Sequence, residues 1–232
     1  MIDIHSHILY GCDDGAKTIE ESLELLKAEK RQGVDLVYFT PHFHTEKNNL
    51  EEYSLLIKEH YNNLLLKTNT PEYPKIKTGF EVHYFSGIKN CDCLDKLALS
   101  GTKLVLTELD FFNITENVIE EICEFSWYTG YTPVLAHIER YHKFPGFKKL
   151  LKEIKKNKVY CQITAASFLN KNIFKKEAFK LLKEGYVNFI ASDTHSLEKR
   201  PPKIKEAFEE ISKKCGKDII NNILEFEKSI NF

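Results

Sequence analysis

The 232-residue sequence lacks an appreciable net charge, because 33 basic and 34 acidic residues leave a formal charge of −1. This balance provides no field that would gather nucleic acid or an anionic membrane, so we expect neither as a partner. No stretch approaches the roughly 20 apolar residues that a membrane-spanning helix requires. The first residues have neither the basic nor the apolar region of a signal peptide. We therefore expect a cytoplasmic protein without membrane insertion.

Cysteine spacing of the kind found in redox and zinc motifs is also missing. None of the six cysteines forms a C-x-x-C pair. Cys91 and Cys93 could contribute to a zinc site, but no second pair accompanies them. A chain of this length can bury a sufficient core without disulfides. We therefore expect reduced thiols, as in a cytoplasm.

No Pro/Gly/Ser-rich linker, repeat or low-complexity stretch divides the chain, which predicts one domain over residues 1–232. Short β-like runs alternate with helical segments throughout. Seven runs are candidate strands: Ile2–Ser6, Val34–Thr40, Lys75–Phe80, Lys103–Thr107, Thr132–His137, Val159–Thr164 and Val187–Ala191. Such alternation predicts an α/β fold with a parallel sheet covered on both faces. Seven βα units in this length favour a closed or nearly closed TIM-like barrel over an open sheet.

Capping signals mark the helices between these strands. Thr18 and Glu21 form a capping box, and Gly33 is a plausible stop for the helix that follows it. Asn113 with Glu116 indicates a second helix start, and Lys171–Glu184 a helix that ends at Gly185.

Imidazoles and carboxylates follow six of the seven candidate strands. Nine of them are candidate metal ligands: His5, His7, Asp14, His42, Glu81, Glu108, His137, Asp193 and His195. The C-terminal strand ends of a β/α barrel form one face, so these side chains should converge there. Crowded buried carboxylates would repel one another unless cations bind between them. Nine ligands exceed the three or four that one zinc ion takes, which indicates two or three ions. The mixed His/carboxylate set suits manganese, iron or zinc.

The other polar residues near these ends have weaker signals. His60 lies in a polar helical stretch and should be exposed, whereas His44, His83 and His142 could line the mouth. Arginine is scarce, yet Arg140 and Arg200 each follow a candidate ligand closely. A guanidinium matches the oxygens of a phosphate, so the two arginines indicate a bound anion.

The order of these motifs resembles the polymerase and histidinol phosphatase (PHP) superfamily. Within it, the sequence looks like the bacterial protein-tyrosine phosphatase branch associated with capsular and exopolysaccharide loci. The most specific segments are Asp13-Asp-Gly15, His137-Ile-Glu-Arg-Tyr141 and Arg200-Pro-Pro202. This resemblance implies a distorted barrel and a phosphotyrosine protein substrate, with the tail of a polysaccharide-assembly tyrosine kinase as the biological target.

The same resemblance implies three ions, typically manganese, with iron or zinc as alternatives. His5, His7, Glu81 and Asp193 would hold the first. Glu81 would bridge to a second, shared with Glu108 and His137, and the third would take Asp14, His42 and His195. Arg140 and Arg200 would bind the phosphate, and Asp193 joins them among the catalytic residues.

Three other functions remain open on the sequence. A histidinol-phosphate phosphatase or a nuclease of the same superfamily would use similar ligands, although a nuclease should carry a basic, aromatic-lined track. A non-catalytic metal-binding regulatory module should have a broken ligand set, and here every position is filled. Thiol-based tyrosine phosphatase chemistry is excluded, since no arginine lies six positions after any cysteine. The sequence predicts no oligomeric state.

Overall fold

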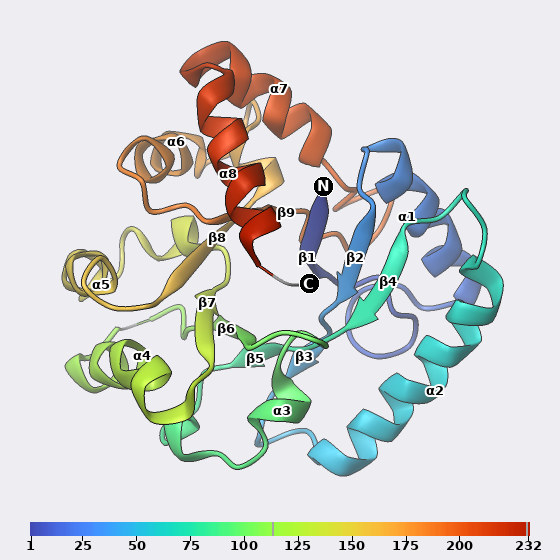
Figure 1. Cartoon of the computed structure of the whole chain (residues 1–232), viewed down its shortest axis with the longest axis horizontal. Helices are drawn as coiled ribbons and strands as arrows, with labels where there is room; N and C mark the ends of the chain where they lie inside the picture. Colours follow the sequence, from blue (N-terminus) through green and yellow to red (C-terminus); the bar gives the residue numbers. More distant parts are fainter. Residues whose placement is uncertain (113, 231) are drawn as a thin grey trace.

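In this computed structural model, which describes residues 1–112, 114–230 and 232, parallel strands lie at the centre and helices surround them (Figure 1). The strands are β1 (Ile2–Ser6), β2 (Leu36–Phe39), β3 (His42–Phe43), β4 (Lys75–Thr78), β5 (Glu81–His83), β6 (Leu104–Glu108), β7 (Thr132–Leu135), β8 (Tyr160–Thr164) and β9 (Phe189–Ala191). They form a three-stranded sheet, β1-β2-β4, and a six-stranded sheet, β3-β5-β6-β7-β8-β9. Every pairing between neighbouring strands is parallel. The predicted α/β class with a parallel sheet curled into a barrel is confirmed.

The barrel is distorted because two of the predicted strands are each followed, after a break, by a short strand that belongs to the other sheet. Residues 34–40 lead into β2, and after Pro41 the chain continues as β3 in the other sheet. Residues 75–78 likewise form β4, and after Gly79 the chain continues as β5, residues 81–83, in the other sheet. A side chain at Gly79 would meet Leu99 at 2.6 Å, so glycine allows the close approach. The described residues form nine strands where the sequence predicted seven, because β3 and β5 are only two and three residues long and lie just beyond the predicted runs.

Backbone contacts also join the two sheets beside β1. His7 N donates to Thr194 O at 2.9 Å, and Asp193 N donates to His5 O at 2.9 Å. A parallel bridge pairs Ser6 with Thr194. These bonds bring the end of β9 against the end of β1, although the two segments lie at opposite ends of the sequence.

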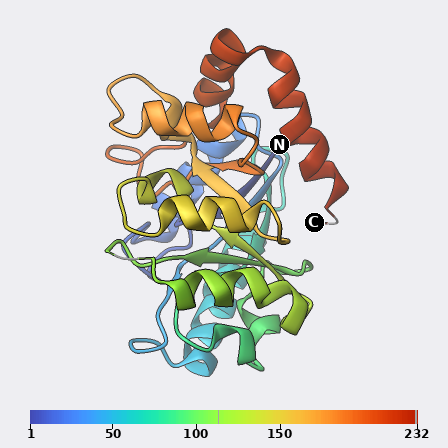
Figure 2. The same ribbon diagram turned by 90° about the vertical axis from the view of Figure 1, so that its left-hand side faces the viewer.

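Helices cover the outside of the barrel in chain order (Figures 1 and 2). They are α1 (Ile19–Arg31), α2 (Leu50–Thr68), α3 (Leu94–Leu97), α4 (Glu116–Thr129), α5 (Phe147–Ile154), α6 (Lys175–Lys183), α7 (Ile204–Cys215) and α8 (Lys217–Ser229). Short 3₁₀ turns follow three strands: η1 (Ile88–Asn90), η2 (Ile138–Tyr141) and η3 (Ala165–Phe168).

Most predicted helix ends are confirmed. The Thr18 hydroxyl accepts from Glu21 N, and Gly33 follows the C-cap of α1 with a φ of 85°, a conformation that favours glycine. The start predicted at Asn113 lies outside the described residues, and Thr115 caps α4. Helix α6 begins at Lys175, later than predicted at residue 171, because the 3₁₀ turn η3 and a loop occupy the preceding residues.

Helix α8 covers the end of the barrel opposite the C-terminal strand ends. Ile4, Tyr38 and Phe189 belong to the small cluster inside the barrel, and Phe226 on α8 packs against it. Tyr160 meets Phe226 edge-on at 4.9 Å between ring centroids. Figure 1 shows α8 crossing in front of the strands, near both termini. This end of the barrel is therefore closed by apolar packing, which leaves the other end for polar side chains.

The α8 carboxylate of Glu227 is buried beneath the barrel, and burial raises its pKa to about 7. In the unfolded chain this carboxyl group loses its proton near pH 4.5, so between pH 4.5 and about 7 the folded state binds more protons than the unfolded state. The free energy of unfolding therefore falls as the pH rises through this range. Glu227→Gln cannot ionise, so we expect it to raise the free energy of unfolding at pH 8 by roughly 2–3 kcal/mol and to change it little at pH 4.5. Urea unfolding at both pH values measures this. Glu225→Gln, at an exposed position of the same helix, is the control. An equal effect of Glu227→Gln at both values would contradict the prediction.

Cys91 and Cys93 form a disulfide, which corrects the prediction of reduced thiols at these positions. The turn between η1 and α3 brings their Cα atoms to 5.3 Å, within the range that a disulfide spans. Chain length and spacing alone could not reveal that local geometry. No helix among the described residues is both long and apolar enough to span a membrane.

Candidate metal centre

The nine side chains predicted as metal ligands lie together at the C-terminal ends of the strands. Eight belong to a strand or follow one within a few residues, and Asp14 comes from the loop between β1 and α1. Parallel strands place these ends at one mouth of the barrel, as the sequence predicted. Seven of the nine form three overlapping groups whose ligand atoms lie within 4.8 Å of one another: His7, Asp14, His42 and His195; His5, His7 and Glu81; and His42, Glu81 and Glu108.

Glu81 lies at the centre of the cluster. Its Oε2 is 3.2 Å from His5 Nε2, 3.3 Å from His7 Nε2 and 2.9 Å from His42 Nδ1. Its Oε1 is 2.9 Å from His137 Nε2. One buried carboxylate therefore contacts four imidazoles from three separate segments of the chain.

Asp193 and Glu108 extend the cluster on either side of Glu81. Asp193 Oδ1 lies 3.6 Å from both His5 Nε2 and His7 Nε2. Glu108 Oε1 lies 3.2 Å from His137 Nε2, and contacts with His137 and His83 outweigh burial to lower the pKa of Glu108 to about 2. Glu108 is thus ionised at neutral pH and available to a cation.

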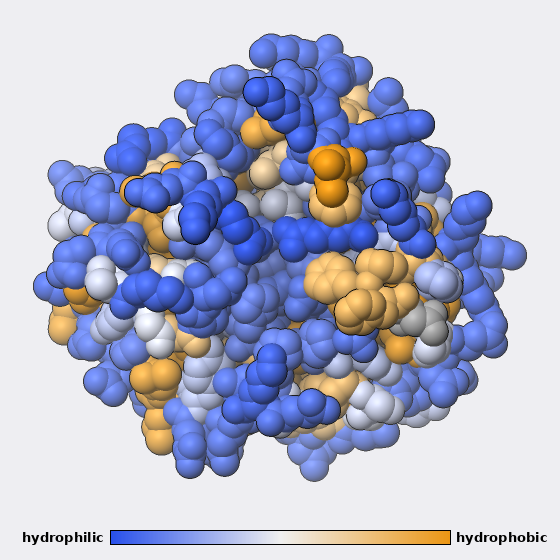
Figure 3. Space-filling view, turned by 180° about the vertical axis from the view of Figure 1, so that it is seen from behind, coloured by the Kyte–Doolittle hydropathy of each residue, from blue (hydrophilic) through white to orange (hydrophobic). Residues whose placement is uncertain are grey.

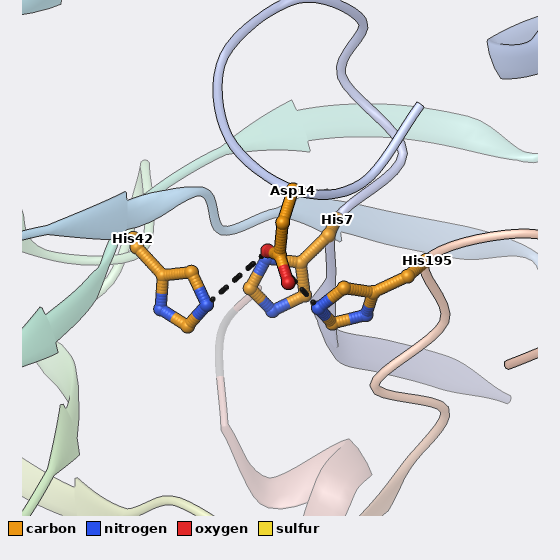
Figure 4. Close-up of side chains that lie close together, drawn as sticks. All are labelled: His7, Asp14, His42 and His195. Carbon is orange, nitrogen blue, oxygen red and sulfur yellow. Dashed lines mark ion pairs between the residues drawn. The ribbon is translucent and has the colours of Figure 1, made fainter. Parts of the chain in front are cut away.

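A third group lies closer to solvent, where Asp14 reaches between two imidazoles (Figure 4). Asp14 Oδ1 is 3.5 Å from His42 Nε2 and 3.4 Å from His195 Nε2. Burial and the charge of His7 lower the pKa of His195 to about 4, so its imidazole is neutral and can offer a lone pair. His42 faces Asp14 with one nitrogen and Glu81 with the other.

The geometry of these contacts fits cations better than hydrogen bonds. Glu81 Oε2 and His42 Nδ1 are buried, lie 2.9 Å apart and have no hydrogen-bond partner among the described residues. His5 Nε2 and His7 Nε2 converge to 3.2 Å. Burial would lower the pKa of His7, but the carboxylates of Asp13 and Glu81 raise it to about 9. Such strong attraction for positive charge suits divalent ions that bind imidazole and carboxylate together.

Two residues outside the predicted ligand set orient the imidazoles. Asp13 Oδ2 lies 2.6 Å from His7 Nδ1, and Gln162 Oε1 lies 3.1 Å from His5 Nδ1. Gln162 also accepts from His137 N at 2.8 Å. Ligand imidazoles commonly bond such partners through their second nitrogen. Asp13 was included in the segment beside Asp14 on the sequence alone, but Gln162 was not identified. The signal for Gln162 was a side-chain amide inside an otherwise apolar strand.

Arg140 and Arg200 meet at the mouth of the cluster. Both guanidinium groups donate to Asp193 Oδ2, Arg200 at 2.6 Å, and Arg140 also donates to Thr164 Oγ1 at 3.3 Å. Their side chains are 24% and 40% exposed, so both reach solvent from a buried anchor. Although burial opposes it, the charges of His5, Arg140 and Arg200 hold the pKa of Asp193 well below its usual range.

Two candidate ligand positions carry backbone strain. His137 and Asp193 have φ angles of 33° and 53°, a region that residues other than glycine seldom occupy. Such strain persists only where the surrounding structure enforces it, and it concentrates at functional sites. The left-handed turns re-aim both side chains into the mouth directly after β7 and β9.

The weaker histidine predictions have mixed outcomes. His83 lies at the mouth, where its Nε2 is 2.9 Å from Asp110 Oδ1. The centroid of the His44 ring lies 4.6 Å from that of the His83 ring. His142 packs edge-on against Phe174 at 5.9 Å. The prediction of an exposed His60 was wrong: it is half-buried, and its Nδ1 bonds Tyr10 O at 2.8 Å, because α2 packs against the loop after β1.

The family model of capsular polysaccharide synthesis proteins CpsB/CapC matches residues 1–229. The chain belongs to the CpsB/CapC family. Tyrosine-protein phosphatase CpsB of Streptococcus agalactiae serotype III (strain NEM316) is 34% identical over 241 residues, which cover 96% of this chain and 94% of that protein. Tyrosine-protein phosphatase YwqE of Bacillus subtilis (strain 168) is 29% identical over 226 residues, covering 94% and 87%.

Solved structures show the same likeness. Crystal structures of YwqE from Bacillus subtilis and CpsB from Streptococcus pneumoniae, described as unique metal-dependent tyrosine phosphatases, include a chain with a TM-score of 0.82 and 26% identity. The match covers 97% of the CpsB/CapC chain described here and 92% of that chain. D-Hydantoinase from Thermus sp. shares the fold alone, with a TM-score of 0.51 and 12% identity over 91% of this chain and 64% of that one.

Proposed function

We propose that this CpsB/CapC protein is a metal-dependent protein-tyrosine phosphatase. The observation that carries the proposal is the convergence of nine candidate His, Asp and Glu ligands with two arginines at one mouth of the barrel. Relatives named tyrosine-protein phosphatases align with this chain over nearly its full length. The family's place in capsular polysaccharide synthesis supports a cytoplasmic polysaccharide-assembly tyrosine kinase, through its phosphorylated tail, as the substrate.

We propose that the cluster binds three divalent ions, with manganese as the expected metal and iron and zinc as alternatives. His5, His7, Glu81 and Asp193 would hold the first ion, and Glu81, Glu108 and His137 the second. Asp14, His42 and His195 would hold the third. When bound, such ions act as Lewis acids toward phosphate oxygens and make water nucleophilic near neutral pH.

The protein's own groups would position the phosphate and steady its charge. Arg140 and Arg200 would bind oxygens of the phosphoryl group, where charge accumulates during transfer. Asp193 Oδ2 accepts hydrogen bonds from both guanidinium groups and so holds them in position. The tyrosine leaving group has a pKa near 10, so it departs more easily than an alkoxide and needs less help from an acid.

The function is tested by comparing kcat/KM for a phosphotyrosine peptide, histidinol phosphate and a single-stranded oligonucleotide, each with excess manganese. We expect the phosphotyrosine peptide to be preferred by at least about tenfold, and a chelator to abolish the activity. Thiol-alkylating agents should leave it intact, since no ligand is a cysteine. A tenfold preference for histidinol phosphate, or rapid oligonucleotide cleavage, would replace the proposal with the corresponding enzyme. No turnover by the metal-loaded protein would indicate a regulatory module.

Metal content provides a separate test of the ligand assignment. After reconstitution with manganese, elemental analysis should find more than one ion per chain, because the ligands exceed the needs of one. Reconstitution with zinc or iron in parallel identifies which ion supports the fastest turnover. At most one bound ion under all three conditions would refute the assignment.

A further inference from the structure

A groove of about 750 Å³ opens beside the two arginines, between the loops that follow β6, β8 and β9. Asp193, Arg140 and Arg200 line its inner end, so it leads directly to the proposed phosphate position. Phe111 and Phe174 provide apolar walls. The Phe111 ring stacks on that of His137 at 5.6 Å, which places this wall against the metal centre.

This groove concentrates positive charge in a nearly neutral chain. Its lining includes five cationic side chains but only one carboxylate, that of Asp193. Lys171 and Lys199 are exposed and form no ion pair with any residue that the structure describes. Lys203 is paired with Glu206 at 2.8 Å. We call this groove the basic groove, and Lys171 and Lys199 are its two lysines without an ion-pair partner among the described residues.

The loop that carries Lys171 is held in a defined shape. Lys171 has a φ of 68°, a left-handed conformation that is uncommon for a lysine. Asn172 Oδ1 accepts from Phe174 N at 2.9 Å, and Lys175 Nζ bonds Asn170 Oδ1 at 2.5 Å. Local bonds thus fix the turn around Lys171.

A second groove of about 700 Å³ lies on the other side of Arg200, between the start of α1 and the loop after β9. Five carboxylates line it: Asp14, Glu20, Glu21, Glu24 and Glu198. It shares Lys199 and Arg200 with the basic groove, and we call it the acidic groove. The two grooves of opposite charge therefore meet at the arginine that would bind phosphate.

Hydrophobic side chains interrupt the polar surface on this face of the molecule. Seen from behind, opposite α8, hydrophobic patches lie among hydrophilic groups (Figure 3). Phe112 and Ile173, from the loops after β6 and β8, are 85% and 84% exposed. Such apolar groups beside the mouth can contact an aryl ring or an extended peptide.

We infer that the two grooves bind the two arms of a phosphotyrosine peptide and select the order of charge along it. This inference rests on the proposed function. Because the two grooves meet at Arg200, a phosphate bound there would let the chain before and after the tyrosine extend into one groove each. Acidic residues on one arm would meet Lys171 in the basic groove, and basic residues on the other would meet Glu20 in the acidic groove. Complementary charge of this kind gives specificity more than affinity.

Two peptides of identical composition test the inference: Glu-Glu-Ala-phosphotyrosine-Ala-Lys-Lys and its charge mirror, Lys-Lys-Ala-phosphotyrosine-Ala-Glu-Glu. The unaltered enzyme should prefer one order by about three- to tenfold in kcat/KM at low salt, since exposed charge pairs contribute modestly. Lys171→Glu and Glu20→Lys should each reduce that preference, and the double variant should invert it. Lys67→Glu, at an exposed site on α2, is the matched control and should preserve it.

Hydrolysis of p-nitrophenyl phosphate separates the grooves from the chemistry, because this small ester has no arms. It should change by less than about twofold in every variant, and a parallel loss would overturn the inference. Equal turnover of the two peptides, or a preference that both substitutions leave intact, would also overturn it. Failure of the proposed function would appear differently, as no turnover of any aryl phosphate. Fluorescence anisotropy with non-hydrolysable phosphonate versions of both peptides then still decides whether the grooves select charge order.

Discussion

Glu81→Gln is expected to reduce kcat/KM for a phosphotyrosine peptide by roughly a thousandfold and to lower the number of bound metal ions. Glu81 contacts four imidazoles with its two oxygens, and among the described residues no other carboxylate contacts as many candidate ligands. The glutamine amide has nearly the same shape as the Glu81 carboxylate but lacks the negative charge that two metal ions would share. The loss of several kcal/mol of charge stabilisation corresponds to a rate effect of this size.

Elemental analysis and steady-state kinetics on the same preparation measure both effects. Glu59→Gln, an identical change at an exposed position of α2, should leave both unchanged. Thermal unfolding without metal identifies a variant that merely fails to fold. A Glu81→Gln protein with unaltered metal content and full activity would remove Glu81 from the centre of the site.

Arg140→Ala and Arg200→Ala should each lower kcat/KM by about ten- to a hundredfold without changing the metal content. A charge-assisted hydrogen bond contributes about 1.5–3 kcal/mol, which corresponds to this range. Both guanidinium groups bond the same oxygen of Asp193, so they form one unit and the double variant should fall short of the product of the single effects.

The sequence contains three arginines, and the third provides the matched control. Arg31 lies in the last turn of α1, away from the strand ends, and Arg31→Ala should preserve the activity. Inorganic phosphate, measured as a competitive inhibitor, should bind more weakly to both site variants. If neither substitution affects turnover or phosphate inhibition, the two arginines have another role.

The positions of the candidate ligands could be predicted because they depend on local patterns. Apolar runs of four to six residues mark strands, and in a parallel barrel every strand end points to the same mouth. His5 and His7 are two residues apart on an extended chain, so their side chains share a face. Such patterns were sufficient for the fold class, the convergence of nine side chains and the family.

Only the tertiary structure decided how these side chains share partners. The kinks at Pro41 and Gly79 move β3 and β5 into the second sheet, which brings His42 and Glu81 level in register. Gln162 supports two imidazoles from the strand with no ligand at its end, and no periodic signal distinguishes that role. The opposed charges of the two grooves likewise arise from distant loops, because periodicity reports which face a residue occupies and not which loop will lie beside it.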